Sequence, residues 1–174
     1  MTTDSSYDIN FQVNLETDLA LPLVRMQQAI EWLLREHDET AGTGVSVVFV
    51  DDDEIRKLNQ QFRQVNTPTD VLSFPADVPL IPEDEDSEPY LGDLVLGLPY
   101  IQRQAQSENH SLSDELVLAV IHGTLHLLDY DHNNAANQAE MWSVQAEALQ
   151  AMGAAITVPL FTFDDDPSGP DRGK

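Results

Sequence analysis

Residues 122–132 read His-Gly-Thr-Leu-His-Leu-Leu-Asp-Tyr-Asp-His and hold three of the five histidines in the chain. His122 and His126 are four residues apart, so a helix over residues 116–128 would project both rings from one face, with Cβ atoms about 5–6 Å apart. At that separation each ring can bring a nitrogen to roughly 2.0–2.1 Å from a single zinc ion. His132 follows six residues later, where a turn can return it as a third ligand.

Three imidazoles within eleven residues favour a metal site more strongly than an isolated histidine pair would. We therefore predict that His122, His126 and His132 bind one Zn²⁺ per chain. Three ligands leave a tetrahedral ion with one open position, the mark of a catalytic site. Imidazole accepts several divalent ions, so nickel or another metal stays open at this point. The remaining histidines, His37 and His110, lie in polar stretches and are expected at the surface.

The residues between the second and third histidine bear on the geometry and type of such a site. Asp129 lies where the helix must end, and Asp tolerates a left-handed backbone better than most residues other than Gly. Asp129 or Asp131 could hydrogen-bond a ligand imidazole or could simply form the turn. Gly123 stands where zinc peptidases with this helix carry a glutamate base, which argues against a peptidase.

The composition limits the classes of protein that fit. The chain has 174 residues, no cysteine and a formal net charge of −23, from 8 basic and 31 acidic residues. Without cysteine, thiolate metal sites, thiol nucleophiles and disulfides are excluded. The strong negative charge argues against tight non-specific binding of nucleic acid, although charges beyond a Debye length of about 8 Å are largely screened from a local site. The start lacks a basic, apolar leader and no run reaches ~18 apolar residues, so we expect a cytoplasmic protein.

Hydrophobic periodicity predicts alternating strands and helices in a single α/β (α+β) domain, with a small mixed β-sheet flanked by helices and a zincin-like metal helix packed on the sheet. After Phe163 the chain is acidic with Pro and Gly, which predicts a disordered tail at 164–174 and a domain over 1–163. The proline-rich acidic stretch 75–90 is expected to be an exposed loop. The expected strands are 9–15, 45–50, 70–74 and 94–96. The expected helices include 23–36, 99–106 and 134–152, the last closed by Gly153. Another helix should follow the acids at 51–54, with Ile55, Leu58 and Phe62 on its inner face. A fifth helix should begin at the capping box formed by Ser111 and Asp114.

A second segment reads Leu-Asn-Gln-Gln-Phe-Arg at 58–63 and Thr-Pro-Thr-Asp-Val-Leu-Ser-Phe-Pro at 67–75. Its Arg63 is one of only eight basic residues. A guanidinium can fork onto phosphate oxygens and stabilise charge in a transition state. The alternative is a surface arginine paired with a neighbouring acid.

The 122–132 run resembles the signature of the YbeY endoribonucleases. The blocks at 58–63, 69–75 and 92–96, and Met141-Trp142 with Gln145, follow in the order of that family. The resemblance implies one metal-dependent, single-strand-specific endoribonuclease domain, acting in the cytoplasm on the 3′ end of 16S ribosomal RNA and in ribosome quality control. It implies the three histidines as zinc ligands and Arg63 as a catalytic residue. Asp129 departs from the family, which usually has Gly there.

The expected partners are single-stranded RNA, ribosomal RNA above all, and a small-subunit ribosomal protein, with no membrane and no DNA. Arg56 and Lys57 are expected to add local positive charge. Two alternatives stay open: a non-catalytic ribosome-assembly factor with structural zinc, and a metallopeptidase-like hydrolase. The general base is not identified by the sequence.

Overall fold

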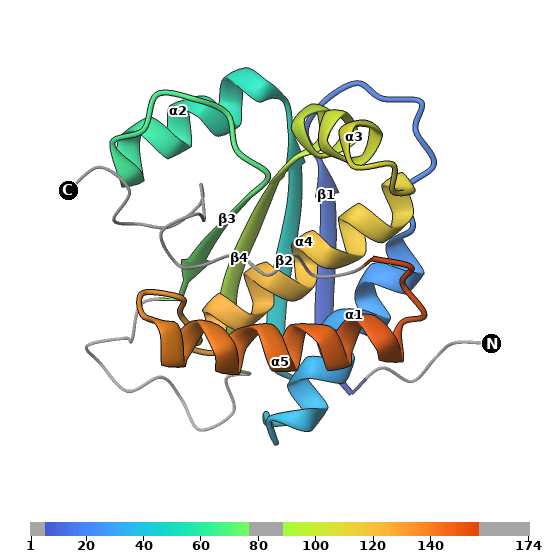
Figure 1. Ribbon diagram of the computed structural model, residues 1–174, viewed down its shortest axis with the longest axis vertical. Coiled ribbons are helices and arrows are strands. Elements are labelled where there is room, and N and C mark those ends of the chain that lie inside the picture. Colours follow the sequence, from blue (N-terminus) through green and yellow to red (C-terminus); the bar gives the residue numbers. More distant parts are fainter. Residues whose placement is uncertain (1–5, 77–88, 157–174) are drawn as a thin grey trace.

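A mixed four-stranded sheet forms the centre of the computed structural model, which describes residues 6–76 and 89–156 (Figure 1). The strands are β1 (Asp8–Val13), β2 (Gly44–Val50), β3 (Val71–Pro75) and β4 (Tyr90–Gly97), in the order β1-β2-β4-β3. The pairs β1 with β2 and β2 with β4 are parallel, whereas β3 runs antiparallel to β4 at one edge. The predicted α/β domain with a small mixed sheet is thus confirmed.

Five helices are distributed over the two faces of this sheet. They are α1 (Leu23–Glu36), α2 (Asp52–Arg63), α3 (Leu98–Ser107), α4 (Leu112–Leu127) and α5 (Ala135–Ala151). The larger core lies between the sheet and the helices α1, α4 and α5 (Figure 1). A smaller cluster packs α2 on the other face through Val50, Ile55, Leu72 and Val95. In the described part of the chain, none of the helices combines the length and apolar character needed to cross a membrane.

Helix α4 is apolar on almost every side, as expected of a helix enclosed by other elements. It begins at the predicted cap, where the Ser111 hydroxyl accepts a hydrogen bond of 3.1 Å from the backbone N–H of Asp114. Ten of its sixteen residues are buried, from Glu115 to Leu127. The burial follows from contacts with α1, α3 and α5 on one side and with β3 and β4 on the other.

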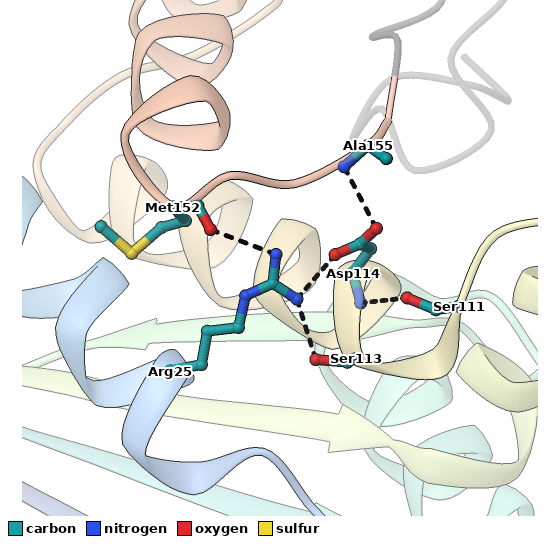
Figure 2. Close-up of polar contacts among 6 residues, drawn as sticks. All are labelled: Arg25, Ser111, Ser113, Asp114, Met152 and Ala155. Carbon is teal, nitrogen blue, oxygen red and sulfur yellow. Dashed lines mark hydrogen bonds and ion pairs between the residues drawn. The ribbon is translucent and has the colours of Figure 1, made fainter.

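Arg25 of α1 holds the beginning of α4 and the end of α5 together (Figure 2). Its guanidinium lies 2.6 Å from the Asp114 carboxylate and donates hydrogen bonds to the Ser113 hydroxyl and to the carbonyl of Met152. Asp114 also accepts a hydrogen bond from the backbone N–H of Ala155. Burial raises the pKa of Asp114, but the hydrogen bonds from Arg25 and Ala155 outweigh it and hold the pKa below its ordinary value.

Three expectations need correction. Phe62 does not lie on the buried face of α2 but is 54% exposed, and its ring meets Phe74 of the edge strand β3. His37 and His110 are partly buried rather than at the surface. His37 contacts the Tyr130 hydroxyl, and His110 pairs with the buried Glu115. Outside the described residues lie most of the predicted acidic loop at 75–90, all of the predicted tail at 164–174, and the predicted domain boundary at 163.

Gly123 sets how closely α4 approaches the sheet. A Cβ atom at this position would lie 2.8 Å from Cδ2 of Leu94 and 3.1 Å from Cγ2 of Val71. Both side chains are buried in the core and have little space to move. The carbonyl of Gly123 accepts a hydrogen bond of 3.0 Å from the Ser73 hydroxyl, which ties the helix to β3.

We predict that Gly123→Ala destabilises the protein although Ala is the better helix former. The helix propensity gain of about 1 kcal/mol is outweighed by overpacking, which costs typically 1–3 kcal/mol. Thermal unfolding of Gly123→Ala should show a lower Tm than the parent. Adding Leu94→Val, which removes the atom nearest the new Cβ, should recover part of this loss. A Gly123→Ala protein that melts above the parent would contradict this close packing.

Candidate metal centre

The three predicted ligands meet at the C-terminal end of α4. His122 and His126 lie on its last two turns, and His132 lies in the segment that leads to α5. The chain turns back because Asp129 adopts a left-handed backbone with φ of 69°, as predicted for this position. Backbone hydrogen bonds from Asp129 to the His126 carbonyl and from Tyr130 to the Leu125 carbonyl close the turn.

The geometry of the three rings fits a single metal ion. One nitrogen from each of His122, His126 and His132 lies within 4.8 Å of the other two. The Nε2 atoms of His122 and His126 are 3.1 Å apart. Two nitrogens bound tetrahedrally at 2.0–2.1 Å would be separated by about 3.3 Å, so little movement is needed to accommodate an ion.

Hydrogen bonds to the remote ring nitrogens orient two of these candidate ligands. Nδ1 of His126 lies 3.1 Å from the Tyr130 carbonyl, which can only accept, so this nitrogen carries the proton. Nδ1 of His122 lies 3.0 Å from Oε1 of Gln145 on α5. With both protons on Nδ1, the two Nε2 lone pairs face each other at 3.1 Å, an arrangement that a cation between them would stabilise.

Gln145, Tyr130 and Trp142 support the site, and their roles did not follow from the residue pattern. Gln145 is a buried polar residue, and Met141 before it and Ala148 after it occupy the same inward face of α5. A polar residue in such an apolar stripe is the signal that could have revealed it. The Trp142 ring lies 5.8 Å, between centroids, from the rings of both His122 and His132.

The two acids of the turn differ in what they contact. The Asp131 carboxylate accepts a hydrogen bond of 2.7 Å from the backbone N–H of His132. This contact supports the turn-forming role for Asp131 among the two that the sequence left open. Asp129 is exposed, and its left-handed backbone is its main contribution to the turn.

Burial keeps His126 neutral. Desolvation is the main cause, followed by the neighbouring His122 and His132 and by the positive charge of Arg63. Together they lower the pKa of His126 from its ordinary 6.5 to about 3. A neutral imidazole is the form that binds metal, so at neutral pH this candidate ligand need not lose a proton first.

A cavity of about 320 Å³ opens beside the histidines. It brings Arg63, from the end of α2, to the same space as His122 and His126. The edge strand β3 contributes Ser73, and the turn contributes Asp129. The remaining lining residues are Val71, Pro75, Tyr130 and Asp131.

Arg63 differs from the other cations in the described ranges 6–76 and 89–156. Of the six basic residues there, five form ion pairs with carboxylates, and Arg63 forms none. The alternative of a surface arginine paired with an acid therefore finds no support among these residues. Arg56 and Lys57, expected to add local positive charge, both pair with Asp53.

Comparison with known proteins points to one family. A family model described as Endoribonuclease YbeY matches residues 12–153. A relative of that name from Shouchella clausii (strain KSM-K16) is 40% identical over 119 residues, which cover 63% of this chain and 72% of the relative. Another from Roseiflexus sp. (strain RS-1) is 34% identical over 154 residues, covering 87% and 96%. The solution structure of a protein from Thermotoga maritima aligns with a TM-score of 0.56 at 30% identity, covering 83% of this chain and 88% of that one.

We predict that the metal-free protein loses stability as the pH falls below about 6.5, the pKa of an exposed histidine. The unfolded chain binds a proton at His126 there, whereas the folded chain resists it down to about pH 3. Between pH 7 and pH 5.5 this histidine should remove about 1 kcal/mol of the free energy of unfolding. The free energy of unfolding is measured by urea in the presence of a chelator, for the parent and for His126→Gln. Because both proteins share their other titrating groups, the difference between their pH dependences isolates the effect of His126. Equal losses in both proteins would show that His126 titrates normally.

Proposed function

The chain belongs to the YbeY endoribonuclease family, and we propose that it is a zinc-dependent endoribonuclease that cleaves single-stranded RNA. We further propose the 3′ end of 16S ribosomal RNA as its substrate, a role in ribosome quality control, and a cytoplasmic location with a small-subunit ribosomal protein as partner. Family membership supports the activity on RNA. The observation that carries the proposal is that Arg63 and two of the three candidate ligands line one cavity.

The chemistry follows from what these side chains can do. A divalent ion at the three imidazoles would supply Lewis-acid activation of a phosphodiester and of water. The carbonyl of Tyr130 and the amide of Gln145 hold the ligand rings in one tautomer. Arg63, without a carboxylate partner in the described part of the chain, can donate two hydrogen bonds to phosphoryl oxygens. Such donors act most strongly on charge that develops in the transition state.

The overall charge makes local recognition necessary. A protein with a net charge of −23 gains no general attraction for a polyanion. Positive charge must therefore be concentrated where the phosphate binds. Arg63, which has no ion pair among the described residues and lines the cavity with His122 and His126, would supply it together with a bound metal ion. The acids elsewhere on the surface are screened at physiological salt.

The packing at Gly123 bears on the peptidase alternative. A zinc peptidase of this helix type needs a glutamate directly after the first histidine. At this position even a Cβ atom would lie 2.8 Å from Leu94, because the helix contacts the sheet there. A glutamate could not occupy the position without moving α4, so this observation argues against a peptidase of this helix type.

We expect Arg63→Ala to lower kcat/KM for a single-stranded RNA by about 10²- to 10³-fold, the usual effect of removing one donor to a transition-state oxyanion. Arg103→Ala is the matched control, because Arg103 is exposed and its ion pair with Asp52 contributes little. It should change kcat/KM by less than about twofold. Cleavage of a labelled oligonucleotide measures both.

His126→Ala tests the metal's role in the same assay. Loss of cleavage with native circular dichroism would support catalysis, whereas unfolding on metal removal would support the structural-zinc alternative. Casein, assayed beside RNA, tests the peptidase. Arg63→Ala or His126→Ala protein that cleaves RNA at the parental rate would refute the proposed function.

A further inference from the structure

Phe62 is a large aromatic side chain at the surface, directly before Arg63 at the end of α2. It is 54% exposed. The large apolar side chains exposed among the described residues also include Val65 close by, and Val13, Val24 and Tyr90 elsewhere. We propose, resting on the proposed function, that the Phe62 ring stacks on an unpaired RNA base next to the phosphate bound by Arg63.

The position of the ring supports this role. Phe62 directly precedes Arg63, which lines the cavity. The Cα atoms of two consecutive residues are about 3.8 Å apart. Its ring meets Phe74 edge to face, with centroids 5.0 Å apart and planes at 71°. Phe74 itself lies between Ser73 and Pro75, which both line the cavity. Side chains alternate along a strand, so the Phe74 ring packs with the small cluster on the α2 face of β3, whereas Ser73 faces α4. The aromatic pair therefore lies across the edge strand from the cavity, and Arg63, next to Phe62 in sequence, is the α2 residue that lines the cavity.

The contact with Phe74 makes Phe62 a suitable platform. Edge-to-face pairs of this spacing stabilise a defined ring orientation. A ring already fixed by a neighbour loses little conformational entropy when a ligand binds to it. Phe74 is itself only partly exposed and packs against the small cluster under α2, so the pair is attached to the folded domain.

The charge of the protein makes stacking valuable. Contacts to phosphate depend on positive charge, and here Arg63 is the one basic residue of the described ranges without an ion pair. Stacking on an aromatic ring does not depend on net charge, and it tolerates any base because every base has a π-face. Bases within a duplex are already stacked on both sides, so only an unpaired base can use the ring. Phe62 would thus contribute to selectivity for single strands.

The test measures equilibrium binding of a short, fluorescein-labelled single-stranded RNA by anisotropy. Phe62→Ala should weaken binding roughly 5- to 140-fold, the range found for loss of one stacked base. Phe62→Trp should bind at least as tightly as the parent, because the larger ring stacks as well. Val24→Ala is the control: it shortens another exposed apolar side chain, 71% exposed on α1, and should change affinity by less than about twofold.

Abasic substrates separate stacking from a structural effect. In the parent, removing one particular base near the cleaved bond should cost about as much affinity as Phe62→Ala does, and in the Phe62→Ala protein removing the same base should cost nothing further. Parental affinity in Phe62→Ala, or equal losses on every abasic substrate, would overturn the stacking proposal alone. A parent that neither binds nor cleaves single-stranded RNA would overturn the proposed function, and the stacking with it.

Discussion

The close packing of α4 against β3 and β4 is the constraint on which the site depends. At Gly123 the helix and sheet are too close for even one additional carbon atom. This contact lies between His122 and His126, so it fixes the height and rotation of the turns that carry both rings. The left-handed backbone of Asp129 then returns the chain, and His132 completes the cluster. A looser helix would keep all three residues but not their separation, and metal affinity depends on that separation.

The elements that the sequence predicted best are those with strong periodicity or clear end signals. Helix 23–36 was predicted with the bounds that α1 has, and Ser111 caps α4 as expected. The spacing of His122 and His126 implied a shared face, because four residues make about one helical turn. The left-handed turn at Asp129 followed from the need to bring His132 back.

Features that depend on tertiary contacts could not be predicted from the sequence. Phe62 has the helical spacing of a core residue, yet the sheet ends at β3 and leaves it exposed. Whether an arginine forms an ion pair depends on which acids the fold brings near it. The sequence therefore could not show that Arg56 pairs with Asp53 whereas Arg63 has no ion pair among the described residues. Gln145 reaches His122 across 23 residues of sequence. Of these residues, Phe62 and Arg63 carry the proposed contacts with the substrate, and Gln145 orients a candidate metal ligand.

In the proposed metal centre, three imidazoles bind one zinc ion and leave one coordination position open for solvent or substrate. X-ray absorption at the zinc edge of the purified protein measures both properties at once. We expect one zinc per chain with three nitrogen ligands at about 2.0–2.1 Å and one exchangeable oxygen ligand. A chain that retains no divalent metal, or an ion enclosed by four protein ligands, would contradict this expectation.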